Sequence, residues 1–182
     1  MAQRIAPAVP PFDPTVGDRL DKRMKGRPPL TLFTTLARDS RLFHRFFDAG
    51  LLDKGNLTMR QREIVIDRTC ALCGAEYEWG VHVTVFGEQA ELTEEQVRST
   101  AIGSADDPCW SAEDRLLIRM CDALHKSCDI DDDLWRELHA AFSEAALLEL
   151  LMLAGRYREV SYLVKVLRMP PEAYARRFPV KA

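Results

Sequence analysis

The sequence predicts an all-α fold, and three observations support this prediction. Apolar residues recur at steps of three and four over most of the chain after residue 30. Residues with helix-capping side chains precede these runs, and a pair of prolines follows the last of them. No stretch of alternating apolar and polar residues is long enough to predict a strand.

The first 30 residues differ from the rest of the chain in composition. They contain six of the ten prolines, and proline favours extended backbone over helix. We therefore expect residues 1–30 to form a proline-rich N-terminal arm, extended or partly disordered, that contacts a neighbouring subunit. Residues 31–182 are expected to form a single all-α domain.

Local signals divide this domain into helices. Apolar residues from Leu32 to Phe47 predict the first helical region. Thr58, with Gln61 three residues later, forms a capping box that begins the next helix, and Gly74 is expected to end it. Later helices are expected over residues 75–90, after Thr93, over residues 111–126 and 131–142, and from Ser143 to about Met169, where Pro170 and Pro171 follow.

Composition and charge limit the classes of partner. The chain has 182 residues, 47% hydrophobic and 29% charged, with a formal net charge of -3 and no basic stripe. These values are ordinary for a globular protein, and they argue against nucleic acid or an anionic membrane as the main partner. The N-terminus has no apolar run of signal-peptide length, and Glu149 interrupts the most apolar run, residues 145–155. We expect a cytoplasmic protein.

The segment from Arg62 to His82 holds the side chains best suited to catalysis. It contains a Cys-x-x-Cys pair, carboxylates, a tyrosine and a histidine, and these side chains perform nucleophilic and proton-transfer chemistry near neutral pH. The chain has five cysteines and no export signal, so they do not predict a disulfide framework. Only Cys70 and Cys73 have a spacing with a known mechanism.

Two interpretations of the cysteine pair remain open. Cys70 and Cys73 lie at a predicted helix joint, where two sulfur atoms can approach within disulfide geometry and reduce a peroxide or a disulfide. The structural alternative is that both are small buried residues of a helix core. A zinc site is less favoured, because no second close Cys/His pair completes four ligands.

Glu78 and His82 form a second candidate. They are four residues apart, so they share one face of a helix, and a carboxylate beside an imidazole raises its pKa and fixes its tautomer. Such a pair can take and return a proton, whereas the structural alternative is a surface ion pair worth about 0.3–0.5 kcal/mol. The weaker candidates for this chemistry are Glu63, Glu76 and Tyr77. The other histidines, His44, His125 and His139, have no comparable neighbours.

At these residues the sequence resembles the carboxymuconolactone decarboxylase and alkylhydroperoxidase D superfamily. The resemblance rests on Glu-Tyr-Glu-Trp-x-x-His, here residues 76–82, with support from residues 60–66 and 154–160. It implies an alkylhydroperoxidase D-like helical fold that forms homo-oligomers with sites near subunit contacts. Peroxidase members place a histidine four residues after the second cysteine, where this chain has Tyr77. Decarboxylase members resemble this chain in having Glu-x-x-x-His, here Glu78 and His82.

The first hypothesis is a thiol-dependent peroxidase or disulfide reductase. The resemblance implies that Cys73 attacks and that Cys70 resolves, whereas the residues alone leave the reverse order open. Glu78 and His82 would relay protons. It would act on a peroxide with an unidentified thiol reductant, and no cofactor or metal is expected. The second hypothesis is a lyase that acts on a small carboxylated lactone or keto acid through Glu78 and His82. The third is a helical oligomer without catalytic activity.

Overall fold

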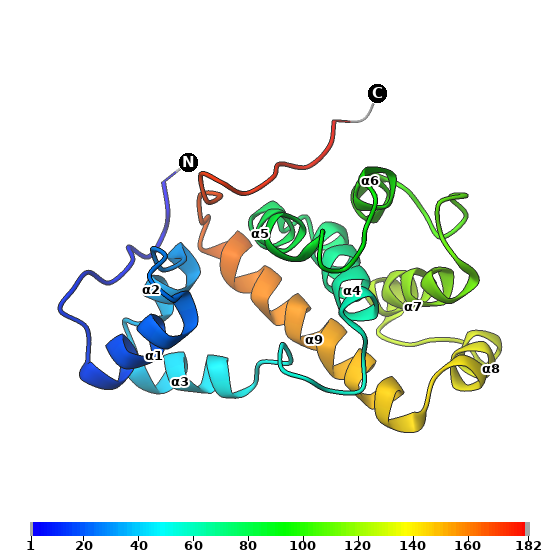
Figure 1. The fold of residues 1–182 in the computed structure, drawn as a ribbon, viewed down its shortest axis with the longest axis horizontal. Helices are drawn as coiled ribbons and strands as arrows, with labels where there is room; N and C mark the ends of the chain where they lie inside the picture. The colour runs from blue at the N-terminus through cyan, green and yellow to red at the C-terminus, as the bar shows by residue number, and fades with distance from the viewer. Residues whose placement is uncertain (1, 181–182) are drawn as a thin grey trace.

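The computed structural model describes residues 2–180, and within this range the chain forms nine helices and no strand (Figure 1). This confirms the predicted all-α class. Residue 1 of the predicted arm and residues 181 and 182 of the predicted domain lie outside the described residues. The helices are α1 (Pro14–Met24), α2 (Thr31–Leu36), α3 (Ser40–Asp48), α4 (Met59–Leu72), α5 (Glu76–Phe86), α6 (Glu94–Ile102), α7 (Ala112–Ser127), α8 (Asp132–Ala141) and α9 (Glu144–Val166).

Helix α4 lies at the centre of the fold. It packs against α5, α6, α7 and α9 (Figure 1), and every residue from Arg62 to Cys70 is buried. A helix covered on all sides must bury its polar residues together with its apolar ones. The charged residues of α4 must therefore find partners inside the protein, and Arg68 does so with Asp122 at 2.6 Å.

Capping boxes begin two of the helices around the site. The sequence predicts the box at Thr58, whereas at Thr93 it predicts only the start of a helix. Thr58 and Gln61 exchange hydrogen bonds at the start of α4, and Thr93 and Gln96 do so at the start of α6. Each box satisfies backbone N–H groups that the first turn of a helix leaves free. The predicted starting points of these helices are therefore confirmed.

A glycine turn joins α4 to α5. Gly74 has a φ of 65°, in the left-handed region that favours glycine. Its N–H donates to the carbonyl of Ala71, and the N–H of Ala75 donates to the carbonyl of Cys70, both at 2.8 Å. These two bonds form the Schellman motif that ends many helices. The turn brings α5 back along α4, so the side chains of the two helices face each other.

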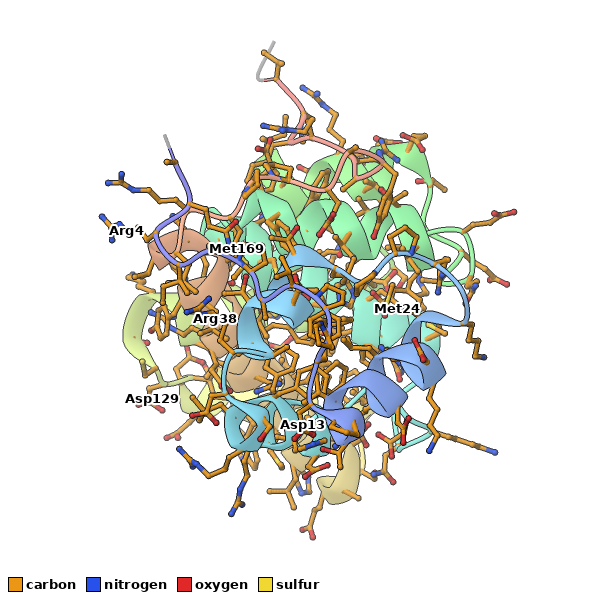
Figure 2. All side chains as sticks on the ribbon, turned by 90° about the vertical axis from the view of Figure 1, so that its left-hand side faces the viewer. Arg4, Asp13, Met24, Arg38, Asp129 and Met169 are labelled. Atoms are coloured by element: carbon orange, nitrogen blue, oxygen red, sulfur yellow. The ribbon has the colours of Figure 1, made fainter. Side chains whose placement is uncertain are left out.

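The N-terminal segment is more ordered than its proline content predicts. Asp13 caps α1 and Pro14 occupies its first turn, where proline is well tolerated. Val16, Leu20 and Met24 of this helix are buried. Before α1 the chain passes the end of α9, where the Arg4 N–H donates to the carbonyl of Leu167 (Figure 2). Residues 14–24 of the predicted arm thus form a helix with one face packed within the same chain, and the contact with a neighbouring subunit stays a prediction.

The C-terminal segment, residues 167–180, runs over α5 (Figure 1). The Tyr77 hydroxyl donates to Glu172, and the Arg176 N–H donates to Thr84 at 3.0 Å. Phe178 packs on Trp79 with ring centroids 5.1 Å apart. This segment holds α5 against α4 from the side opposite to the α4–α5 contact. Of the helices that the structure describes, none has the length and apolar character needed to cross a membrane.

We predict that Gly80→Ala destabilises the protein. A Cβ atom at this position in α5 would overlap the carbonyl oxygen of Arg176, so the C-terminal segment must move. We expect a loss of about 1–3 kcal/mol in the free energy of unfolding, measured by chemical denaturation.

Gly155→Ala is the matched control, since Gly155 also lies inside a helix but has no atom within 4 Å of the added Cβ. It should stabilise the protein by about 0.5–1 kcal/mol. Equal effects of the two substitutions would contradict the close contact at Gly80.

Candidate active site

A buried histidine lies between two glutamates where α4 and α5 meet. His82 Nδ1 lies 2.7 Å from Oε2 of Glu63, and His82 Nε2 lies 3.4 Å from Oε1 of Glu78. The exposed fractions of the three residues are 1% for Glu63, 3% for His82 and 7% for Glu78. These contacts therefore form in the interior, where ion pairs interact more strongly than at the surface.

Helix α9 contributes a tyrosine to the same group. The Tyr157 hydroxyl lies 3.0 Å from His82 Nε2, and the two rings meet edge to face with centroids 5.0 Å apart. Tyr157 is itself buried. Burial and the nearby carboxylates of Glu78 and Glu63 raise the pKa of its hydroxyl. Tyr157 therefore stays protonated and can hold a hydrogen bond to the imidazole or to a ligand.

Arg62 adds a positive charge to the site. Its Nε donates to Oε1 of Glu63 at 3.0 Å, so each oxygen of this carboxylate has a charged partner. The guanidinium also donates to the carbonyl of Leu52 at 3.1 Å and lies over the ring of Phe86. Because Glu63 is held from both sides, it fixes the orientation of the His82 ring.

The carboxylates change the charge state of His82. Burial disfavours the imidazolium, but Glu63, and after it Glu78, outweigh this effect and raise the pKa of His82 to about 10. His82 therefore carries a proton on both ring nitrogens near neutral pH. An imidazolium can donate a proton or a hydrogen bond, but it cannot act as a base.

Two carboxyl groups keep oxygen atoms without a partner. Within the described residues, neither oxygen of Asp67 and only one oxygen of Glu78, Oε1, has a hydrogen-bonding or ionic partner. Asp67 is completely buried one helical turn after Glu63. Burial and the Glu63 charge raise the pKa of Asp67 well above its usual range. The site thus combines paired groups with free acceptor atoms.

The two cysteines of the Cys-x-x-Cys pair differ in their surroundings. Cys70 is completely buried in α4. Burial, Glu78 and Asp67 raise the pKa of its thiol, so the nucleophilic thiolate is disfavoured. Cys73 caps the end of α4, is half-buried, and has its Sγ 4.0 Å from Nδ1 of His125. Both are free thiols in the structure.

Two weaker candidates lie on the other face of α5. Glu76 accepts the backbone N–H of Phe178 and pairs with Arg177 at 2.7 Å. Tyr77 donates to Glu172 and accepts the N–H of Leu32. Both residues hold the C-terminal segment on α5, and Tyr77 also ties α5 to α2. In the described part of the chain neither residue forms a hydrogen bond or an ion pair with His82.

Three members of the site were not among the candidates from the sequence. Tyr157 lies 75 residues from His82 in the chain, and no local spacing connects them. Arg62 and Asp67 stood inside the segment of interest without an assigned role. The signal for Asp67 is a charged residue directly after the apolar residues 64–66, since a carboxylate next to a buried run predicts an unusual interior.

The remaining histidines lie elsewhere. His44 contacts Thr15 and Arg19 beside α1, and His139 lies at the exposed end of α8, 3.8 Å from Glu144. Within residues 2–180, no group of three or more His, Cys, Asp or Glu side chains has the arrangement of a metal site.

Comparison with known proteins finds a family model that matches the segment holding this site. The model of the carboxymuconolactone decarboxylase family matches residues 40–118, which include Glu63, Glu78 and His82. No curated protein sequence shows a significant match to the chain.

Several solved structures share the fold. An uncharacterised peroxidase-related protein from Silicibacter sp. TM1040 aligns with a TM-score of 0.80 at 12% identity, over 98% of this chain and 99% of the other. A second, from Ralstonia eutropha JMP134 and described as an alkylhydroperoxidase AhpD core, has a TM-score of 0.75 at 18% identity, over 94% and 95%. The debrominase Bmp8, in complex with 2,3,4-tribromopyrrole, has a TM-score of 0.73 at 14% identity, over 96% and 94%.

At these identities the structural likeness establishes the fold alone. The family match covers the segment that carries the buried glutamates and the histidine. The nine-helix arrangement of residues 2–180 agrees with the AhpD-like structures over almost the whole chain. Residues 40–118 thus match the family model, and the fold is that of the alkylhydroperoxidase D-like structures, in agreement with the resemblance of the sequence to the carboxymuconolactone decarboxylase and alkylhydroperoxidase D superfamily.

Proposed function

We propose that the protein is an acid–base enzyme of this superfamily, acting on a small carboxylated lactone or keto acid. The observation that carries the proposal is the buried group of Glu63, His82, Glu78 and Tyr157, in which one oxygen of Glu78 remains free. Burying charges is costly, and stability alone rarely repays the cost. Perturbed titrating groups gathered in the interior are typical of active sites.

The two sides of His82 divide the chemistry. Glu78 Oε2 is the acceptor that can take a proton from carbon beside a carbonyl or a carboxylate. The His82 imidazolium then stabilises the negative charge that develops on the neighbouring oxygen, and it can return a proton at the end. In a decarboxylation the electrons of the broken C–C bond pass to that same oxygen, and a proton replaces the lost carboxylate.

The partners of His82 prepare it for this role. Glu63 holds Nδ1 at 2.7 Å, and Arg62 holds Glu63 in turn. Tyr157 at 3.0 Å supplies a hydroxyl beside Nε2, on the side of Glu78. A ring fixed in this way loses little orientation entropy when a substrate binds.

A thiol peroxidase is the second candidate, and one observation favours it. Cys73 is half-buried beside His125, which lines a cavity of about 170 Å³ together with Cys121, Cys128 and Arg158. In this reaction the Cys73 thiolate attacks a hydroperoxide, which leaves as an alcohol, and a sulfenic acid forms. The Cys70 thiol then displaces water to form a disulfide, which an external thiol must reduce.

The environment of Cys70 favours the acid–base enzyme over the thiol peroxidase. This thiol is completely buried between acidic groups, which oppose the thiolate that disulfide exchange requires. The homo-oligomeric assembly and the cytoplasmic location stay predictions from the sequence. A helical oligomer without catalysis is the outcome if the protein turns over neither the acid–base substrates nor a peroxide.

The first prediction separates the two enzyme classes by substitution. Glu78→Gln should lower turnover by about 10²–10⁴-fold, because it removes the proton acceptor but keeps the size of the side chain. The double variant Cys70→Ser with Cys73→Ser should keep most of the rate. Turnover is measured with acetoacetate and small enol lactones, by CO2 release and by hydrogen exchange at carbon in D2O.

Glu76→Gln is the matched control, since it removes a neighbouring carboxylate whose hydrogen-bond and ionic partners in residues 2–180 lie in the C-terminal segment. It should leave the rate unchanged. Equal rates for Glu78→Gln and the wild type argue against the acid–base proposal. A peroxide turnover that disappears only in the double serine variant favours the thiol peroxidase instead.

The second prediction concerns pH and stability. The pKa of His82 is about 10 in the folded protein and about 6.5 when unfolded. The folded state binds this proton more tightly, so its stabilising effect is complete below pH ~6.5 and is lost as pH rises through about 10. Unfolding free energy, measured in urea between pH 6 and 10.5, should therefore fall with pH.

His82→Gln should flatten this dependence, whereas His139→Gln, at an exposed position, should not change it. A slope that is the same in the wild type and in His82→Gln would show that His82 does not hold the extra proton.

A further inference from the structure

Asp67 is the buried titratable group that the chemistry above does not use. It lies in α4, four residues after Glu63 and three before Cys70, and it interacts electrostatically with both of them and with His82. Its exposed fraction is 0%, and neither of its oxygens has a hydrogen-bond partner among residues 2–180. A buried ionised carboxylate without any donor is strongly disfavoured, because it loses its hydration and gains nothing in exchange.

The charges around Asp67 are already balanced without it. Arg62 and the His82 imidazolium carry two positive charges, and Glu63 and Glu78 carry two negative charges. The titratable groups that face Asp67 are Glu63 and Cys70 on its own helix and His82 on α5. Of these only His82 is positive. Glu63 accepts a hydrogen bond from its Nδ1–H group, and Glu78 lies beside its Nε2 atom.

We propose that Asp67 is present as the neutral carboxylic acid and donates a hydrogen bond to the substrate oxygen that gains negative charge during the reaction. This inference rests on the proposed acid–base function and adds a second donor to it. A neutral acid has one O–H group to give, and no protein acceptor in the described chain occupies it. A buried carboxylic acid is an effective donor to an oxyanion, because it adds no charge to the site.

The arrangement also defines the class of ligand. Asp67 offers a hydrogen-bond donor, and Glu78 Oε2 offers an acceptor. Cys70 lies close enough to both carboxyl groups for each to raise the pKa of its thiol. A fitting ligand has a carbonyl or lactone oxygen for Asp67 and an acidic hydrogen on the adjacent carbon for Glu78. A small enol lactone or β-keto acid has both groups, whereas a hydroperoxide has no carbon acid for Glu78.

The first test observes the proton on Asp67 directly. Protein labelled with 13C at aspartate carboxyl carbons is studied by infrared spectroscopy at pH 7, where a protonated carboxylic acid absorbs apart from carboxylates. We expect one protonated aspartate, and Asp67→Asn should remove its signal. Asp114→Asn is the matched control, because Asp114 is buried but paired with Arg60 at 2.9 Å. A fully ionised spectrum overturns the inference.

The second test compares stability with turnover. Asp67→Leu removes an unsatisfied polar group from the interior and should raise the melting temperature, whereas Asp114→Asn should lower it. The same Asp67→Leu variant should lose about 10²–10³-fold in turnover of the acetoacetate and lactone substrates. Asp67→Asn, which keeps a neutral donor, should recover part of this loss.

These outcomes separate the inference from the proposed function. If Asp67→Leu turns over substrate as fast as the wild type while Glu78→Gln is inactive, the role of Asp67 is wrong and the acid–base function stands. If Glu78→Gln is fully active, the proposed function fails, and the substrate role of Asp67 fails with it. A lower melting temperature of Asp67→Leu would show that Asp67 supports the fold and would overturn the inference.

Discussion

The burial of α4 is the constraint on which the rest of the structure depends. Four helices cover it, so its charged side chains have no access to water over more than two turns. Each must be paired, neutralised or held by a backbone carbonyl. Glu63 is paired with His82 and Arg62, and Arg68 is paired with Asp122. The candidate site is the part of this interior where the pairing is incomplete.

The local features of the fold could be predicted because they depend on neighbouring residues. Thr58 with Gln61 and Thr93 with Gln96 are separated by three residues, and helix geometry alone decides that they meet. Gly74 ended α4 as expected, since few other residues accept its backbone conformation. The proline content of residues 1–30 does not predict the N-terminal helix, because it ignores where each proline lies. Pro14 lies in the first turn of α1, where proline is well tolerated.

The site could be predicted only in part, for a related reason. The spacing of Glu78 and His82 predicts their contact, but at 3.4 Å it is the longer of the two carboxylate contacts. The shorter one joins Glu63 to His82 across the α4–α5 turn, and its geometry depends on how the two helices cross. Tyr157 comes from α9, far along the chain. Cys70 and Cys73 look equivalent in sequence, yet one faces the interior and the other the surface at the helix end.

The contact of the C-terminal segment with α5 has a consequence for how the site is assembled during synthesis. Glu172, Arg176 and Phe178 reach α5, and they are made long after His82 has left the ribosome. Tyr157, which completes the surroundings of the imidazole, also comes late. The nascent chain therefore exposes Asp67 and His82 as ordinary hydrated side chains. The upward shifts of their pKa values arise only in the last stage of folding, when α9 and the segment after it close the interior.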